Sequence, residues 1–160
     1  MCNPLLSKHV FLLVLCIAVW NLPIISARNQ ATLASDPPLT TVHINNNLPI
    51  ALEYFTIHCQ TNTEDLGVHE IACDTAYERS FRFGGVTLLT CGINFRRYPQ
   101  GRLEDVFGVF DMYVADRDKS RCPTNCIWNV TEGGVYGYRD YNVGDSDISL
   151  EWPKPPPQMS

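Results

Sequence analysis

Apolar side chains recur at every second position along most of this 160-residue chain, and this period of two constrains its fold most strongly. It predicts strands, because successive side chains of a strand point to opposite faces of a sheet. No segment shows convincingly the three-and-four spacing of an amphipathic helix. The predicted strands cover residues 42–45, 50–55, 77–83, 89–93, 106–115, 125–130, 135–138 and 148–152.

Short groups of turn-forming residues separate these strands. They are Asn45-Asn46-Asn47, Asp65-Leu66-Gly67, Gly84-Gly85, Pro99-Gln100-Gly101 and Glu132-Gly133-Gly134. About eight strands at this spacing predict an all-β fold, namely a small antiparallel β-sandwich.

The first 27 residues have the features of a secretory signal peptide. Lys8 precedes an apolar run at residues 10–20, and the small residues Ser26 and Ala27 come after it, so we expect cleavage near Ala27. The run is too short to cross a hydrocarbon core, which takes about 20 residues. We therefore expect a secreted, extracellular protein without membrane insertion.

The chain divides into four expected segments. They are a signal peptide at residues 1–27, a disordered N-terminal segment at 28–38, one β-sandwich domain at 39–152 and a Pro-rich C-terminal tail at 153–160. The chain beyond the leader has the size of one ordinary domain. We expect the tail to be a solvated end, and a polyproline II ligand for an SH3-like groove is the alternative.

The charge balance bears on the partners. The chain carries 12 Lys and Arg against 17 Asp and Glu, a formal net charge of −5. Nucleic acids and anionic membranes are bound by clustered basic side chains, and only Arg96 and Arg97 form a close basic pair. We therefore expect no nucleic-acid partner.

Export also decides the chemistry of the cysteines. In an oxidising compartment thiols mostly form disulfides, each worth roughly 2–4 kcal/mol to a small domain. Five cysteines lie beyond the leader, so one is left over: Cys59, Cys73, Cys91, Cys122 and Cys126. The alternative is a zinc site built from Cys122, Cys126 and the adjacent His58 and Cys59, although its spacing does not match a zinc finger.

A series of motifs in fixed order carries a resemblance to a known family. The motifs are residues 42–48 (VHINNNL), Ile57-His58-Cys59-Gln60, residues 65–69 (DLGVH), Thr87-Leu88-Leu89-Thr90-Cys91, Phe110-Asp111-Met112-Tyr113, Arg117-Asp118 and residues 122–128 (CPTNCIW). In this order they resemble the plant self-incompatibility S1 family, and the resemblance covers residues 42 to about 138.

This resemblance implies a small secreted β-sandwich that is held by two disulfides among Cys59, Cys91, Cys122 and Cys126. It also implies a protein ligand of a plant cell-surface receptor and not an enzyme. We expect this ligand to be a monomer with no cofactor and no metal. Family members are similar to stigma proteins that arrest incompatible pollen through a membrane receptor and calcium, so pollen–stigma recognition is one case. The alternative is an apoplastic defence protein or a carbohydrate-binding module without catalysis, using Tyr98, Tyr138 or Tyr141.

Three pairings of the four cysteines stay open. We expect Cys59 and Cys91 each to join one member of the pair Cys122 and Cys126. Cys73 departs from the family pattern, in which glycine is usual, and we expect a buried free thiol. The alternatives for Cys73 are a small-thiol cap or an intermolecular disulfide.

Asn129-Val130-Thr131 is a glycosylation sequon, and secreted proteins often use such sites. Strand alternation places Cys126, Trp128 and Val130 on the core face and Asn129 on the solvent face. We therefore expect a glycan on Asn129; the alternative is an unmodified surface side chain.

No catalytic residue is predicted. A secreted nuclease would use two histidines as acid and base, but His43 and His58 lie in predicted strands and His69 comes after a turn. We expect these histidines to be packed or hydrogen-bonded. The hydrolase, metalloprotease and phosphate-loop motifs are absent from the sequence.

A charged loop at residues 116–121 is the candidate receptor-contact loop, because recognition residues tend to lie on loops that a rigid scaffold fixes. Its residues are Asp116, Arg117, Asp118, Lys119, Ser120 and Arg121. The alternating basic residues make it a poor calcium site. The alternative is a solvated, disulfide-anchored surface without a partner, and residues 60–67 and 96–104 are further exposed candidates.

Overall fold

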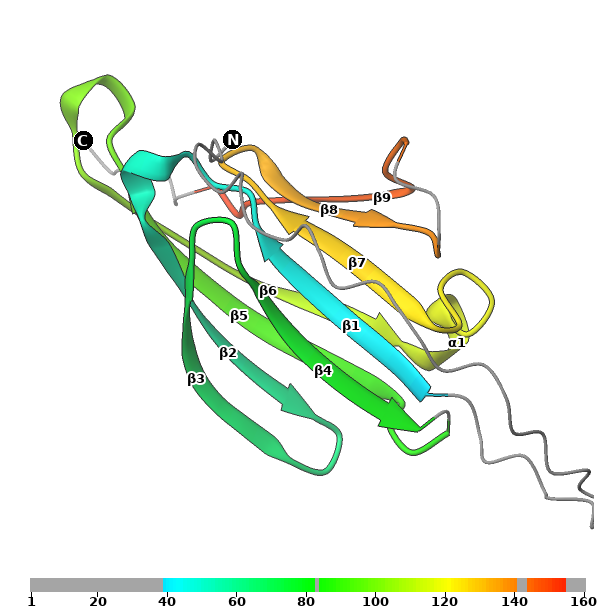
Figure 1. Cartoon of the computed structure of the whole chain (residues 1–160). Helices are drawn as coiled ribbons and strands as arrows, with labels where there is room; N and C mark the ends of the chain where they lie inside the picture. The colour runs from blue at the N-terminus through cyan, green and yellow to red at the C-terminus, as the bar shows by residue number, and fades with distance from the viewer. Residues whose placement is uncertain (1–38, 83, 141–143, 155–160) are drawn as a thin grey trace, which may run out of the picture. The chain divides into compact units, whose positions relative to one another are not determined.

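The computed structural model describes residues 39–82, 84–140 and 144–154, and these form a β-sandwich (Figure 1). The strands of this part of the chain are β1 (Leu39–Asn46), β2 (Tyr54–Thr61), β3 (Asp65–Ala72), β4 (Ala76–Arg82), β5 (Leu88–Arg97), β6 (Glu104–Val114), β7 (Asn125–Val130), β8 (Gly134–Tyr138) and β9 (Ile148–Glu151). The helical turns are η1 (Ile50–Leu52), η2 (Pro99–Gly101) and α1 (Ala115–Asp118). The all-β prediction is confirmed. The predicted signal peptide, the segment 28–38 and residues 155–160 of the tail lie outside the described residues.

Two sheets form the layers of the sandwich. One has the order β4-β1-β7-β8-β9 and the other β3-β2-β5-β6. All pairs are antiparallel except β1 with β7, which run parallel, with Ile44 opposite Trp128. The parallel pair arises because the chain crosses from β6 in one sheet through α1 to β7 in the other, and so enters beside β1 in the same direction.

The core lies between the two sheets, where the alternating apolar side chains meet. Ile44 on β1, Ile57 on β2 and Trp128 on β7 are completely buried. The indole Nε1 of Trp128 donates to the carbonyl oxygen of Met112 at 2.8 Å, which joins β7 to β6 across the core. Because successive side chains of a strand point to opposite faces, the residues that alternate with these buried ones lie on the outer faces of the two sheets.

Two sequence predictions about strands are wrong in part. Residues 50–52 of the predicted strand 50–55 form η1, and the strand begins only after Glu53, whose φ is 51°. The predicted turn at residues 65–67 is instead the start of edge strand β3. Gly67, at a φ of 76°, lies where the pairing of β2 with β3 shifts between His58 and Gln60, so this glycine accommodates a bulge.

Two disulfides form among the four expected cysteines, but the predicted pairing is wrong. Cys59 joins Cys91 and Cys122 joins Cys126, with Cα–Cα distances of 4.1 and 5.0 Å. Cys59 and Cys91 are directly opposite each other on β2 and β5, so their sulfurs meet within one sheet. Cys122 and Cys126 lie at the entry to β7. Both members of the zinc alternative's Cys122/Cys126 limb are therefore occupied by a disulfide.

Candidate recognition surface

The outer face of the four-stranded sheet exposes apolar side chains in its centre. In register across β3, β2, β5 and β6 lie Val68, His58, Gly92 and Val109, and the next row contains Thr56, Asn94 and Phe107. Val68, Phe107 and Val109 are 63%, 57% and 58% exposed. The name Phe107 face is used for this set of residues: Thr56, His58, Gln60, Val68, Thr90, Gly92, Asn94, Phe107 and Val109.

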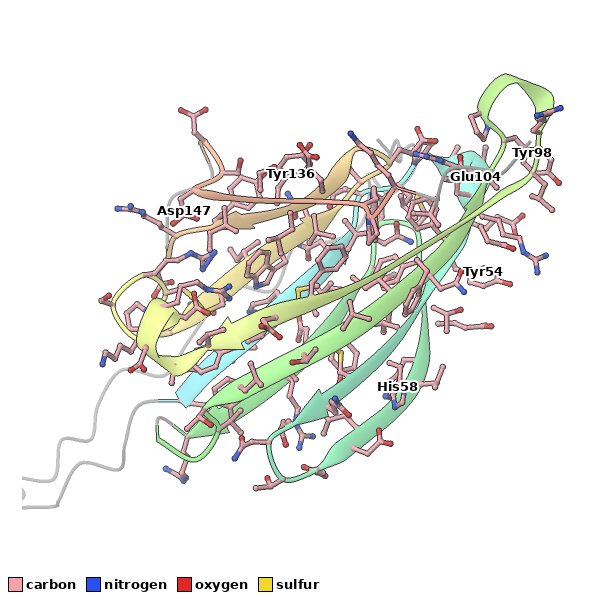
Figure 2. The ribbon with its side chains drawn as sticks, turned by 180° about the vertical axis from the view of Figure 1, so that it is seen from behind. Tyr54, His58, Tyr98, Glu104, Tyr136 and Asp147 are labelled. Atoms are coloured by element: carbon pink, nitrogen blue, oxygen red, sulfur yellow. A yellow bond between two sulfur atoms is a disulfide. The ribbon has the colours of Figure 1, made fainter. Side chains whose placement is uncertain are left out.

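Gly92 makes a hollow in this face. Because the residue has no side chain, the Phe107 face surrounds a depression of about 300 Å³. A Cβ at this position would lie 3.4 Å from Cε2 of Phe107 and 3.8 Å from the carbonyl oxygen of His58, which are ordinary contacts. The hollow is therefore open space above β5, and a larger residue at position 92 would not clash with the backbone. Figure 2 labels His58 on this sheet and Tyr136 on the other.

Carboxylates border the Phe107 face. Asp65, Glu70, Asp105 and Asp111 are all exposed around it. Arg96 pairs with Asp105 at 3.0 Å, and the hydroxyl of Thr90 donates to Asp111 at 2.7 Å. At the described outward positions of these four strands, Arg96 is the one basic side chain besides His58. The border is therefore acidic around a centre without Asp, Glu, Lys or Arg side chains.

His58 connects the centre of the face to this border. Its Nε2 lies 2.7 Å from Oδ1 of Asp65. The backbone N–H of Gly67 donates to the same carboxylate at 2.9 Å. The hydrogen bond from Gly67 and then the one with His58 lower the pKa of Asp65 below its ordinary value of 3.8, so this carboxylate stays charged in mild acid.

Only some side chains of the predicted receptor-contact loop, residues 116–121, are exposed. Asp116, Lys119 and Ser120 are exposed, but the side chain of Asp118 is completely buried and that of Arg121 is 7% exposed. Residues 115–118 form the single helical turn α1. Asp118 and Arg121 cannot contact a receptor in this arrangement, and the contact role of the exposed members stays a prediction.

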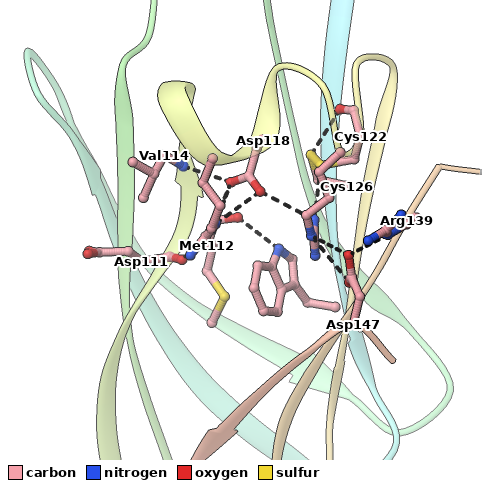
Figure 3. A network of polar contacts seen from close by, with 11 residues as sticks. Asp111, Met112, Val114, Asp118, Cys122, Cys126, Arg139 and Asp147 are labelled. Carbon is pink, nitrogen blue, oxygen red and sulfur yellow. Dashed lines mark hydrogen bonds and ion pairs between the residues drawn. A yellow bond between two sulfur atoms is a disulfide. The ribbon is translucent and has the colours of Figure 1, made fainter. Parts of the chain in front are cut away.

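The two buried loop residues belong to a network of charges over the core (Figure 3). Asp118 accepts hydrogen bonds from the N–H of Val114 at 2.8 Å and from Nη2 of Arg117 at 2.8 Å. Arg121 lies 3.3 Å from Asp118 and 3.1 Å from Asp147. The guanidinium carbons of Arg117 and Arg121 lie 5.3 and 5.1 Å from the ring centre of Trp128. This network holds the loop onto the sandwich.

Asn129 lies where the sequence predicts, on the outer face of the five-stranded sheet. Cys126, Trp128 and Val130 are buried, whereas Asn129 is half-buried. Its Oδ1 accepts a hydrogen bond from Nδ2 of Asn45 at 2.9 Å. A hollow of about 440 Å³ lies beside it, between Asn45, Thr75 and Tyr138. Glycosylation of Asn129 stays a prediction.

The histidines of the nuclease alternative do not converge. His43 is on the outer face of the five-stranded sheet, where Nδ1 lies 3.0 Å from Glu78 and Nε2 lies 3.3 Å from Asn125. His58 is on the outer face of the other sheet. His69 lies on edge strand β3, with Nε2 2.9 Å from the carbonyl oxygen of Leu66. The core separates His43 from His58, so these two cannot act on one bond.

The remaining expected positions are spread over the surface. Cys73 is half-buried between β3 and β4, where its sulfur lies 3.5 Å from the carbonyl oxygen of Leu48 and is not without a partner. The expected buried free thiol is therefore not supported, and a small-thiol cap and an intermolecular disulfide stay as the alternatives. In the candidate segment 96–104, Tyr98 is 68% exposed. Tyr138 is half-buried, and Tyr141 lies outside the described residues.

The Phe107 face was not predicted from the sequence, although a signal for it exists. Between Val106 and Phe110 apolar residues or glycine occupy both alternating positions, so one strand offers apolar side chains to both faces. Such a strand is normally covered on both sides. In the structure Val106 and Phe110 face the core, while Phe107 and Val109 face outward.

The described part of the chain lacks two other kinds of feature. No helix there is long and apolar enough to cross a bilayer. Among residues 39–82, 84–140 and 144–154, no three His, Cys, Asp or Glu side chains gather in an arrangement that could hold a metal ion.

Comparison with known proteins gives consistent similarities. The family model described as Plant self-incompatibility protein S1 matches residues 41–152. The chain is 37% identical to S-protein homolog 6 of Arabidopsis thaliana over 103 residues, which is 63% of this chain and 68% of that protein. It is 36% identical to S-protein homolog 24 of Arabidopsis thaliana over 104 residues, 64% of this chain and 62% of that protein. The chain thus spans about two thirds of each relative's length.

Two more distant similarities point the same way. Self-incompatibility protein S1 of Papaver rhoeas is 26% identical over 84 residues, 51% of this chain and 56% of that protein. Among solved structures, a Self-Incompatibility Protein Homologue, from a family described as small, highly stable, secreted proteins from plants, superimposes with a TM-score of 0.51. It is 15% identical and covers 74% of this chain and 97% of its own, so it supports the fold alone.

Proposed function

The chain belongs to the plant self-incompatibility protein S1 family, and we propose that it is a secreted protein ligand that binds a cell-surface receptor in cell–cell recognition. Secretion is supported by the leader-like first 27 residues. The two disulfides are in keeping with an oxidising compartment. Pollen–stigma recognition is one setting for such a ligand.

The Phe107 face is the observation that carries the proposal for this chain. Three large apolar side chains, Val68, Phe107 and Val109, are more than half exposed in one patch. In soluble proteins, exposed apolar patches mostly mark binding sites. By contrast, apart from Leu39 at the start of β1, which is 55% exposed, the described outward positions of β1 and β7 are polar or half-buried: Thr41, His43, Asn45, Asn125, Ile127 and Asn129. A rigid, disulfide-linked sheet presents the Phe107 face with little loss of conformational entropy on binding.

Saturable binding of the purified, oxidised mature protein to pollen tubes and to other plant cells tests this function, with cytosolic calcium recorded at the same time. We expect the double variant Phe107→Thr/Val109→Thr to weaken binding by about tenfold or more, because removing each of the two anchors costs about 1 kcal/mol or more and tenfold corresponds to about 1.4 kcal/mol. Threonine is β-branched, and this shape suits a strand at both positions.

Ile127→Thr is the matched control, because it removes an apolar side chain from the outer face of the other sheet. We expect its binding to equal that of the wild type. A wild-type protein that binds no plant cell would overturn the ligand proposal. Retention of the protein on a glycan array instead would favour the carbohydrate-binding alternative.

A further inference from the structure

We infer that the hollow over Gly92 is a socket for one large apolar side chain of the receptor, and that basic side chains of the receptor flank this anchor. This inference rests on the proposed ligand function and adds the chemistry of the partner. It is carried by the shape of the Phe107 face, by its lining and by the charges around it.

The size of the hollow fits a single anchor residue. Its volume of about 300 Å³ is bounded by Phe107 and Val109 on one side and by Val68 and His58 on the other. Interfaces commonly concentrate their binding energy in one or a few aromatic or large aliphatic side chains that fill such a pocket. A glycine in the floor lets the inserted side chain approach the strand backbone closely.

The lining favours a hydrocarbon or aromatic side chain over a sugar. Val68, Val109 and the ring of Phe107 offer no hydrogen bonds to a ligand, so sugar hydroxyls would be desolvated against them without compensation. Thr56, Gln60, Thr90 and Asn94 surround this centre with hydroxyl and amide groups. This arrangement of an apolar centre and a polar rim is typical of protein–protein interfaces.

The charges at the border decide between protein partners. Four carboxylates, Asp65, Glu70, Asp105 and Asp111, surround the face, and Arg96 offsets one of them. A second copy of this chain would bring the same acidic border into contact with it, and like charges at an interface oppose association. A receptor segment with Lys or Arg on both sides of its anchor complements the border and would be steered toward it.

Filling the hollow tests the socket. Gly92→Leu should fold, because a Cβ there meets no atom closer than 3.4 Å and leucine can lie in the hollow itself. We expect its binding to plant cells to be weaker by about tenfold or more, since the anchor is excluded. Ser149→Leu is the matched control: it adds the same side chain at an exposed position of β9, and its binding should equal that of the wild type.

Neutralising the border tests the charge of the partner. Glu70→Gln combined with Asp111→Asn keeps the size of both side chains, and the asparagine still accepts the hydrogen bond of Thr90. We expect association with the cells to slow several-fold at low salt, and the difference from the wild type to vanish at about 1 M salt, where screening is strong. Faster association of this variant would overturn the inference that the receptor carries basic side chains around its anchor.

The outcomes distinguish failure of the socket from failure of the proposed ligand function. If the wild type binds no cell, the ligand function itself fails. If the wild type binds and Gly92→Leu binds equally well, the socket alone is overturned. Self-association in sedimentation that Gly92→Leu abolishes would assign the hollow to a second copy, and loss of glycan-array binding in the same variant would assign it to a sugar. Each of these two results overturns the receptor anchor.

Discussion

At the scale of single residues, Asp118 has the least exposure in a loop at residues 116–121 that is charged at every position except Ser120. Its carboxylate accepts the N–H of Val114 and binds Arg117 and Arg121, and no part of its side chain is exposed. A buried charge is tolerated when it is paired and hydrogen-bonded, as it is here. The loop is therefore anchored by one of the residues that the sequence suggested for contact.

Replacing Asp118 should destabilise the fold strongly. We expect Asp118→Ala to lower the free energy of unfolding by about 3–5 kcal/mol, because it leaves the N–H of Val114 without its acceptor and takes one of two carboxylates away from buried Arg121. Asp116→Ala is the control from the same turn. Its side chain is 97% exposed, so we expect a change within about 0.5 kcal/mol. Urea unfolding measures both, and equal values for the two variants would contradict the structural role of Asp118.

Asp65 should make stability depend on pH in the acid range. Its pKa is lowered in the folded protein, chiefly by the hydrogen bond from Gly67 and then by that with His58. Its contribution is therefore complete above the ordinary value of 3.8 and is lost as the pH falls through the lowered pKa. We expect the difference in unfolding free energy between wild type and Asp65→Asn to shrink as the pH falls below 3.8. A difference that stays the same or grows below pH 3.8 would contradict this.

At the scale of elements, each disulfide reinforces one local connection and neither joins the two sheets. Cys59–Cys91 closes a loop with a sequence separation of 32 and links β2 to β5, whereas Cys122–Cys126 spans a separation of only 4. The sandwich is instead joined by core packing and by contacts such as that of Trp128 with Met112. The two bridges should therefore differ in their effect on stability.

Removing the bridges in turn measures this difference. In the chain-entropy treatment, we expect Cys59→Ala/Cys91→Ala to cost about 4 kcal/mol and Cys122→Ala/Cys126→Ala about 2 kcal/mol. All four cysteines are completely buried, so the packing losses are matched. Urea unfolding of the oxidised proteins gives the two values. A larger loss for the second pair would contradict the entropic account, and peptide mapping checks the pairing itself.

At the scale of the whole molecule, the two outer faces of the sandwich have different chemistry. The five-stranded sheet carries the sequon at Asn129 beside a polar hollow, and the four-stranded sheet carries the Phe107 face. A glycan on Asn129 would cover the first face and leave the second accessible. We therefore propose that modification and recognition lie on opposite sides of the sandwich.

Glycosidase treatment of the secreted protein tests this division. We expect the wild type to gain gel mobility on treatment, and Asn129→Gln to show the faster mobility without it. Thr131→Ser is the control, because serine keeps both the sequon and a hydroxyl for the hydrogen bonds that Thr131 makes with Gly133 and Gly134. Binding to cells should not change on deglycosylation. Loss of cell binding on deglycosylation would indicate that the receptor binds the five-stranded sheet and not the Phe107 face.

Much of the architecture was predictable from the sequence by itself. The period of two predicted the all-β fold and most of the strands, because alternation is a local property of extended backbone. The same reasoning placed Trp128 in the core and Asn129 on the outside, and both are confirmed. The ordered motifs predicted the family, which the match over residues 41–152 confirms.

Tertiary structure alone decided the cysteine pairing, the burial of Asp118 and the Phe107 face. The Cys59–Cys91 bridge and the Phe107 face depend on which strands are neighbours and in which register, and residues far apart in the chain set that. Cys59 meets Cys91 because β2 pairs with β5 in one register. Asp118 is buried because two arginines neutralise it over Trp128. Gly92 forms a hollow only because Val109 and His58 stand beside it on adjacent strands.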